Sequence, residues 1–322
     1  MDNNFAAFIV PAGIGASIGG FAGDAGIYAR KLSHDIKLIV NPNVVNAACF
    51  SAINDSMLYV EGFALNRFFK GDIALRKSTN KIGVIFDKAI PQGVLNVHIN
   101  TLNAMKMVYG VEGIEFEVTS QAACVNFEIS SSNISTGSVD NLDTLIEAGH
   151  KLVKKGCSAL AVVCRFDETP DDGYENGQGV DIVGGVEAII SHALSRKFNL
   201  PCAHAPAFED MTISTGIVSP KAAAEYITPT FLPCIILGLW HAPQLIDIKK
   251  ASCGDIVIED LKALVMPYNA LGSTPVFKSL EKNIPVLAVK ENSTVLSVDK
   301  NKLELADIVE LEKYADVAQY LS

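Results

Sequence analysis

The chain has 322 residues, of which 49% are hydrophobic and 19% are charged, and its formal net charge is −10. This length and apolar content are enough for one large domain or for two smaller ones that share an interface. The acidic balance argues against a nucleic-acid-binding protein, which needs a basic surface to neutralise phosphates.

Nothing in the sequence predicts export or a membrane span. The first ten residues contain no basic residue and no long apolar stretch, so a secretory signal is not expected. The apolar run 231–239 is interrupted by Pro233 and Gly238 and is too short to cross a bilayer. The seven cysteines, an odd number without CxxC spacing, are expected to be buried thiols rather than disulfides. We therefore expect a soluble, cytoplasmic protein without a membrane partner.

Short apolar runs alternate with helical patterns along most of the chain. The runs are apolar on both faces, as parallel strands covered by helices require. Strands are expected at residues 5–10, 36–40, 57–60, 82–86, 114–118, 159–164, 234–237, 263–266 and 286–289. Helices are expected at 140–155, 183–198 and 274–282. This order predicts an α/β fold of Rossmann-like type, with mostly parallel sheets and helices on both faces.

The polar segment 123–138, rich in serine and asparagine, interrupts this rhythm. We interpret it as a link between an N-terminal α/β half, residues 1–138, and a C-terminal half, residues 139–322, around a central cleft. One continuous domain is the alternative. Ligands of open α/β sheets bind beyond the carboxyl ends of the strands, so the segments that follow the strands are the candidates for function.

The first expected strand leads into the glycine-rich segment 11–24, after which a helix begins. Such a loop can present backbone N–H groups to a phosphate or a carboxylate. The segment matches neither the dinucleotide fingerprint nor the Walker A motif. A tight turn with close helix packing is the alternative to anion binding. The candidate ligand-binding residues of this loop are Gly13, Gly15, Gly19 and Gly20.

Polar residues also follow the next strands. Asn43 lies in an asparagine–proline turn, and Arg165 directly follows the strand expected at 159–164. The polar segment 170–179 is interpreted as a mobile loop. Beyond it, Asp181 and Gly185 precede or open the helix expected at 183–198. We expect ligand contacts from these four residues, with turns, helix caps and surface charge as the local alternatives.

Candidate catalytic groups are concentrated in one part of the chain. The acid–base and nucleophile candidates are Asp24, Glu187, His192, Cys202 and His204. Cys202 and His204 would share one face of a short strand, as a nucleophile pair requires. A packed thiol beside a hydrogen-bonded histidine is the alternative. The His and Cys spacing matches no structural zinc pattern, so no residue is assigned as a metal ligand. We expect no cofactor, and a bound divalent metal ion is the alternative.

A second loop of anion-binding type is expected near the C-terminus. Asn269, Ser273 and Thr274 lie between the strand expected at 263–266 and a helix, where an ordinary N-cap is the alternative. Glu291 and Asn292 follow the last expected strand and would face the same crevice.

Several phrases of the sequence resemble a known family. They are VPAGIGASIGGFAGDA (10–25), NPNVVNA (41–47), LYVEGFAL (58–65), GQGVDIVGGVEAIISHAL (177–194), PCAHAPA (201–207), FLPCIILGL (231–239) and ENSTVL (291–296). They resemble domain-of-unknown-function family 3326, an uncharacterised bacterial and plastid-lineage family. The resemblance covers nearly the whole chain and implies no reaction.

A second, local likeness concerns residues 183–187 and the helix that follows them. This segment is similar to one in the phosphoribosyltransferases that attach the lower ligand of cobalamin, where a glycine-flanked glutamate lies at the nucleotide site. The likeness adds phosphate-bearing metabolites to the expected ligands.

These features together predict an enzyme that acts on a small phosphate- or carboxylate-bearing metabolite. Transfer or hydrolysis is favoured over redox chemistry because the dinucleotide fingerprint is missing. The alternative is a non-catalytic sensor or binding protein, which needs the anion loops but no acid–base pair. The surplus of apolar residues favours a homo-oligomer.

Overall fold

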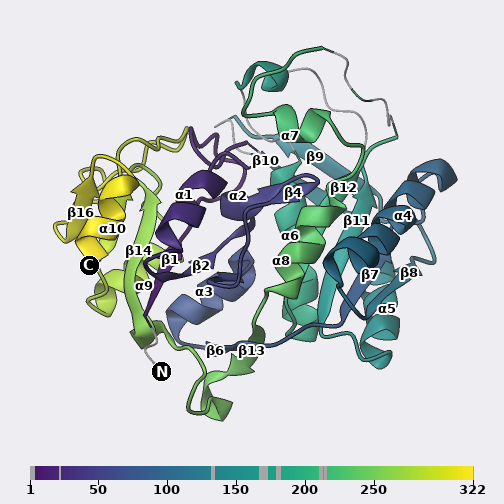
Figure 1. Cartoon of the computed structure of the whole chain (residues 1–322), viewed down its shortest axis with the longest axis horizontal. Helices are drawn as coiled ribbons and strands as arrows, with labels where there is room; N and C mark the ends of the chain where they lie inside the picture. The colour runs from purple at the N-terminus through teal and green to yellow at the C-terminus, as the bar shows by residue number, and fades with distance from the viewer. Residues whose placement is uncertain are drawn as a thin grey trace.

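Two parallel β-sheets lie side by side and each is covered by helices, as the computed structural model shows (Figure 1). The structure describes residues 4–21, 23–131, 135–166, 173–178, 183–209, 213 and 216–321. The expected α/β fold of Rossmann-like type is confirmed.

The first sheet is built from both ends of the chain, and its strands follow the order β16-β15-β14-β1-β2-β5. Every neighbouring pair in it is parallel. Its strands are β1 (Phe5–Phe8), β2 (Lys37–Val40), β5 (Met57–Tyr59), β14 (Leu261–Pro267), β15 (Val286–Val289) and β16 (Ile308–Leu311).

Helices cover both faces of this first sheet because side chains alternate along each strand. Phe8 packs on the side of α1 (Gly26–Leu32) and α10 (Ala315–Leu321). Ala7 packs on the opposite side, with α3 (Gly62–Lys70) and α9 (Thr274–Glu281).

The second sheet has the order β12-β11-β7-β8, again all parallel. Its strands are β7 (Ile82–Phe86), β8 (Ile114–Val118), β11 (Ala159–Arg165) and β12 (Cys202–Ala207). The helices α4 (Gln92–Tyr109) and α8 (Leu232–Trp240) cover one face. The helices α5 (Leu142–Lys154) and α6 (Gly184–Phe198) cover the other. The core under α8 is continuous with the core under α1 and α10, so the two sheets share one hydrophobic interior.

Short antiparallel pairs complete the structure. The pair β6 (Ile73–Arg76) and β13 (Gln244–Asp247) lies where the chain passes between the two sheets (Figure 1). The hairpin of β9 (Val125–Ile129) and β10 (Ser135–Val139) packs on α6. Smaller elements are α2 (Pro42–Val45), β3 (Asn46–Ala47), β4 (Phe50–Ser51), α7 (Ala223–Tyr226) and the 3₁₀ turns Tyr174–Asn176, Ile248–Lys250 and Ile258–Asp260.

The segment 123–138 is therefore mostly hairpin in its described part, not a polar link. The two expected halves, 1–138 and 139–322, do not correspond to the two sheets. Each sheet contains strands from before and from after residue 138.

The strand expected at 234–237 is wrong, since these residues lie inside helix α8. Residues 232–239 are all buried, so the segment carries no polar face from which a period of 3.6 could be read. Pro233, in the first turn of α8, fits a helix start because its missing N–H has no partner to lose there.

The structure also bears on the expected absence of disulfides and on the expected absence of a membrane span. All seven cysteines, each within the described part, are free thiols, and Cys157, Cys164, Cys202 and Cys234 are buried. None of the helices that the structure describes combines the length and the apolar character needed to cross a membrane.

Candidate functional site

Residues 11–24, which we call the glycine loop, follow β1. Hydrogen bonds to residues near the C-terminal end of the chain hold this loop in place. The backbone N–H of Ser17 donates to the carbonyl oxygen of Ser293 at 2.7 Å. The N–H of Ile18 donates to Oδ1 of Asn292 at 3.1 Å. The side-chain amide of Asn292 in turn donates to the hydroxyl of Tyr314 at 2.7 Å. The loop is thus fixed by residues nearly 280 positions away in sequence.

The first half of the glycine loop keeps its backbone donors available. No described residue accepts a hydrogen bond from the N–H groups of Gly13, Gly15 or Ala16. Gly13 and Gly15 adopt φ angles of 67° and 54°, which turn successive peptide groups in a way that side-chain-bearing residues resist. Asn43 supports the loop by donating to the carbonyl oxygen of Pro11 at 3.2 Å. The second half is packed, because a Cβ at Gly20 would lie 2.1 Å from the Ala16 carbonyl oxygen.

The glycine loop meets the start of α6, which belongs to the second sheet. A Cβ on Gly13 would lie 3.2 Å from the Cβ of Ser135 and 3.8 Å from the backbone nitrogen of Gly185. The N–H of Gly185 donates to the hydroxyl of Ser135 at 2.9 Å. A Cβ on Gly185 would lie 2.1 Å from the Ser135 carbonyl oxygen. Only glycine allows these three segments to approach so closely, and two of the expected ligand-binding residues, Gly13 and Gly185, are brought together there.

A buried acid–base pair includes Glu187 in the first turn of α6. Oε2 of Glu187 is 3.8 Å from Nε2 of His204, whose side chain is 15% exposed, while that of Glu187 is 8% exposed. Nδ1 of His204 is 3.0 Å from the hydroxyl of Ser191. Glu187 and Ser191 are four residues apart and so share one face of the helix. Burial, with a smaller contribution from the charge of His192, lowers the pKa of His204 from 6.5 to about 3. The ring is therefore neutral at physiological pH and able to accept a proton.

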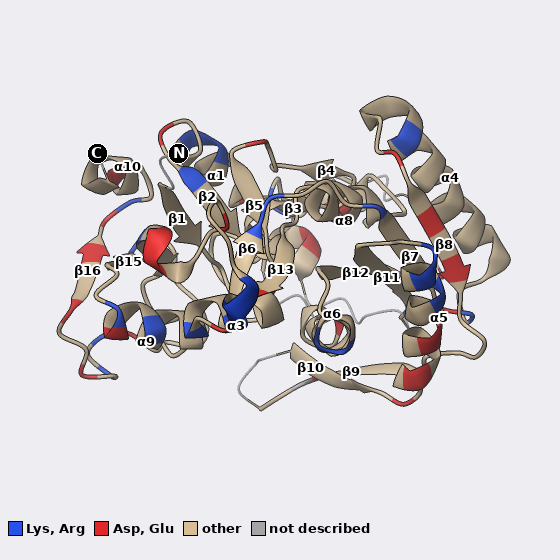
Figure 2. Cartoon of the chain, turned by 90° about the horizontal axis from the view of Figure 1, so that it is seen from below, with Lys and Arg blue, Asp and Glu red and all other residues tan. Residues whose placement is uncertain are grey.

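His192 lies beside this pair and reaches the first sheet. A Cβ on Gly62, the first residue of α3, would lie 2.9 Å from Nε2 of His192. Burial lowers the pKa of His192 below its usual value. Figure 2 shows α3 and α6 next to each other, with the β9–β10 hairpin on the far side of α6. The catalytic candidates Glu187, His192 and His204 thus form one cluster between the two sheets.

Asp24 ends the glycine loop and does not join the Glu187–His204 pair through any described contact. Its Oδ1 accepts the N–H of Gly19 at 2.5 Å. Burial raises the pKa of Asp24 from 3.8 to about 6, against the opposing effects of the Gly19 hydrogen bond and the charge of Lys221. The ammonium of Lys221 donates to the carbonyl oxygen of Ser17 at 2.7 Å.

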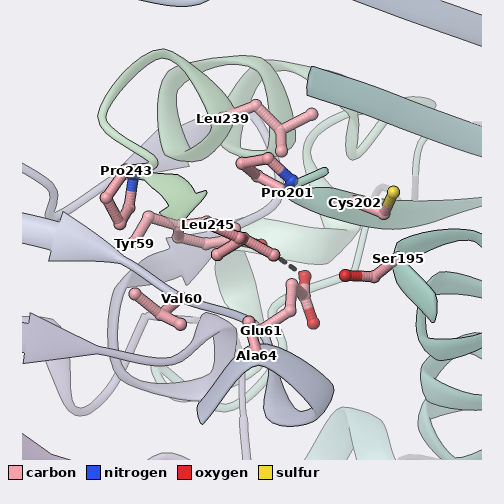
Figure 3. A pocket seen from close by; sticks show the side chains of 10 residues that line it. All are labelled: Tyr59, Val60, Glu61, Ala64, Ser195, Pro201, Cys202, Leu239, Pro243 and Leu245. Carbon is pink, nitrogen blue, oxygen red and sulfur yellow. Dashed lines mark hydrogen bonds between the residues drawn. The ribbon is translucent and has the colours of Figure 1, made fainter. Parts of the chain in front are cut away.

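A small pocket with room for about one water molecule opens between the sheets near α3 and α6 (Figure 3). Glu61, which is 6% exposed, points into it. The hydroxyl of Tyr59 donates to Oε1 of Glu61 at 2.9 Å. Burial raises the pKa of Glu61 from 4.5 to about 8. Ser195 and Cys202 line the opposite side.

The surroundings of Cys202 favour a packed thiol over a nucleophile. The side chain is fully buried, and its Sγ donates to the carbonyl oxygen of Leu200 at 3.5 Å. Burial raises the pKa of the thiol well above its usual value, which disfavours the thiolate. Cys202 and His204 do lie two positions apart on β12, but the described partner of His204 on its Nδ1 side is Ser191.

Several of the remaining candidates have other described partners, and the carbonyl oxygen of Glu291 accepts a hydrogen bond from the Ser17 hydroxyl of the glycine loop at 3.5 Å. Arg165 ends β11 and pairs with Glu209 at 3.2 Å. Asn269 bonds to the backbone of Thr294 in both directions, at 2.8 and 2.9 Å. Glu291 accepts the backbone N–H of Tyr314. Asp181 lies outside the described residues, as do residues 170–172 and 179 of the segment 170–179.

Ser273 and Thr274 begin α9, where Ser273 is the N-cap residue without a side-chain cap bond. No contact between described residues joins them to the glycine loop. Within the described part of the chain, no three His, Cys, Asp or Glu side chains are arranged to hold a metal ion.

Sequence reasoning missed three residues of this region, namely Ser135, Ser191 and Lys221. Ser191 had a usable signal, since Glu187, Ser191 and Ser195 recur every four residues in the helix expected at 183–198. Polar residues at that spacing form a stripe that faces one neighbour. Ser135 and Lys221 reach the site through long-range folding and carry no local pattern.

Comparison with known proteins places the chain in a family. An uncharacterised lipoprotein of Synechococcus sp. is 37% identical over 296 residues, which cover 90% of this chain and 82% of that protein. No solved structure matches the chain significantly. The model of the family described as "Protein of unknown function (DUF3326)" matches residues 5–322, so the resemblance seen in the sequence is confirmed and the chain belongs to this family.

Proposed function

We propose that the protein is an enzyme that acts on a small anionic metabolite, in a transfer or hydrolysis reaction. One observation carries the proposal. The glycine loop, whose free backbone N–H groups have no acceptor among the described residues, lies against the N-terminus of α6. The buried Glu187–His204 pair lies close to that N-terminus, with Glu187 in the first turn of α6 and His204 on the neighbouring strand β12.

In this proposal the anion binds to the N–H groups of the glycine loop, assisted by the positive end of the α6 dipole. The reacting group then lies toward His204. Burial keeps the ring of His204 neutral, with a pKa of about 3. The ring therefore has a lone pair for the proton, and the charge of Glu187 has to offset the cost of protonating it during the reaction. Glu187, at 3.8 Å, stabilises the imidazolium that forms. Ser191 holds the ring through Nδ1 and acts as a positioning residue.

A turnover screen tests the proposal. The purified protein is incubated with a pool of small phosphate- and carboxylate-bearing metabolites, and substrate loss and product gain are followed by mass spectrometry. Matched incubations use Glu187→Gln, which keeps the size of the side chain, and Glu147→Gln on α5, an exposed carboxylate of the same type. Turnover that Glu147→Gln retains and Glu187→Gln loses supports the proposal.

Binding of one metabolite without turnover would favour the non-catalytic sensor instead. The same pool, examined by ligand-detected NMR, separates these outcomes. Loss of binding in Gly15→Val, but not in Gly71→Val, would assign the ligand to the glycine loop, since both glycines have positive φ and only Gly15 lies in that loop.

Two accompanying expectations need experiments of their own. The sequence favours a cytoplasmic location, whereas the relative in Synechococcus sp. is named a lipoprotein. Fractionation of cells that express the full-length protein, followed by immunoblotting, distinguishes the two. Light scattering coupled to size-exclusion chromatography tests the expected homo-oligomer.

A further inference from the structure

We infer that Lys221 is a ligand of the anion at the glycine loop and that this anion is a phosphate group. The inference rests on the proposed function, because it names a binding residue and a ligand class for the same site. Lys221 comes from the segment 216–226, which no local sequence pattern connects with the glycine loop.

Several described contacts bring this segment over the loop. The N–H of Ser219 donates to the carbonyl oxygen of Glu175 at 2.7 Å, which ties the segment to residues 173–178. The rings of Tyr174 and Phe21 lie 4.8 Å apart, centre to centre. The ammonium of Lys221 lies 5.5 Å from the centre of the Phe21 ring and 2.7 Å from the Ser17 carbonyl oxygen. The cation is therefore held at the loop by contacts on two sides.

The ammonium group has donors to spare at this position. A lysine carries three N–H donors, and among the described residues Ser17 accepts one of them. Lys221 is otherwise exposed. The uncommitted N–H groups of Gly13, Gly15 and Ala16 lie only a few residues before Ser17.

This combination of donors favours phosphate over carboxylate. A phosphate group offers more acceptor oxygens and up to two negative charges, so it can engage loop N–H groups and a lysine at once. Lysine is a common ligand of phosphate, which it binds as a point charge alongside backbone N–H groups. Asp24, whose charge acts on Lys221, would compete with the phosphate for the ammonium.

Calorimetric titration with inorganic phosphate, and separately with acetate, tests the inference on the full chain. We expect phosphate to bind the unmodified protein more tightly than acetate does. Lys221→Met should weaken phosphate binding by about tenfold or more, as the loss of a charged hydrogen bond implies. Lys221→Arg should retain most of the affinity, and Asp24→Asn should increase it. Lys106→Met, an exposed lysine of α4, changes the net charge equally and should leave the affinity within about twofold of the original.

The outcomes separate this inference from the proposed function. Equal phosphate affinity in Lys221→Met and Lys106→Met would overturn the role of Lys221 and leave the function untouched. Tighter binding of acetate than of phosphate would overturn the ligand class alone. No binding of either anion at millimolar concentration would overturn both. Thermal unfolding of each variant without phosphate shows whether a lost affinity reflects a lost fold.

Discussion

Oε2 of Glu187 and Nε2 of His204 lie 3.8 Å apart, although one residue belongs to the first turn of α6 and the other to the middle of β12. The helix and the strand pack on each other, so the pair is fixed by two rigid elements rather than by a loop. Burying a carboxylate next to a neutral histidine costs stability, and ionisable groups in such surroundings are concentrated at functional sites. Its properties can be tested without knowledge of the substrate.

The first prediction concerns the pH dependence set by His204. In the unfolded chain its pKa is near 6.5, and in the folded protein it is about 3. Between these values the unfolded state binds more protons, so the folded state loses stability as the pH falls from about 6.5 toward 3. His204→Asn should remove this loss. Urea unfolding at pH 7, 6, 5 and 4 should show the free energy of unfolding of the original protein falling relative to that of the variant. A constant difference across this range would contradict the prediction.

Glu61 should act in the opposite direction. Its pKa is raised from 4.5 to about 8, so the folded state binds the proton more tightly and loses stability as the pH rises from about 4.5 to 8. Glu61→Gln keeps an acceptor for the Tyr59 hydroxyl and carries no charge. The variant should therefore be more stable than the original protein at pH 8, with a melting temperature at least ~2 °C higher, and the gain should shrink toward pH 5.

Tyr59→Phe provides the matched control for that experiment. It removes the donor to Oε1 of Glu61 and should destabilise the protein by about 1–3 kcal/mol. If Glu61→Gln were destabilising at pH 8 as well, the Glu61 carboxyl would have to be ionised and paired in the folded state.

A third prediction concerns the contact between the β9–β10 hairpin and α6. Gly185→Ala places a Cβ 2.1 Å from the Ser135 carbonyl oxygen, so we expect a loss of about 1–3 kcal/mol in the free energy of unfolding. Gly93→Ala, on the exposed side of α4 with nothing within 4 Å of the new Cβ, should instead stabilise the protein by about 0.5–1 kcal/mol. Urea denaturation measures both. Equal effects of the two substitutions would mean that the approach of residue 135 to residue 185 is looser than described.

The thiols provide a fourth prediction. Cys124 and Cys253 are exposed, whereas four of the other cysteines are buried. A thiol reagent such as Ellman's reagent should modify these two rapidly in the folded protein, and denaturation should be needed for the buried ones. Cys202→Ser should leave the rapid phase unchanged, because burial raises the pKa of that thiol. A fast reaction assigned to Cys202 by mass spectrometry would restore it as a candidate nucleophile.

The parallel strands could be predicted from the sequence because they are buried on both faces. The strands expected at 82–86, 114–118 and 286–289 match β7, β8 and β15 residue for residue. The helix α8 was mistaken for a strand, since a helix buried on all sides loses its periodic pattern just as a buried strand does. The strands β6, β9, β10 and β13 were missed because their residues are partly polar and their pairing depends on distant partners.

The site was predicted in part for a similar reason. Gly13 follows β1, Gly185 and Glu187 begin the helix that precedes β12, and His204 lies within β12, so elements of the expected parallel fold position all four. Lys221 and Ser135 could not be predicted, because each reaches the glycine loop from a segment whose position is decided by the whole fold. Ser273 was assigned to a second loop of anion-binding type, and the described contacts of α9, which follows it, are with α3 and the first sheet.

The arrangement of the first sheet also bears on how the protein is made. Its central strand β1 lies between β2 and β14, and β14 begins only at Leu261. On the ribosome, β7, β8, β11 and β12 emerge and can pair with one another before that partner exists. During synthesis, the edge of β1 that pairs with β14 therefore stays unpaired until β14 is made. An unpaired apolar edge of this kind is a surface on which a nascent-chain chaperone would act.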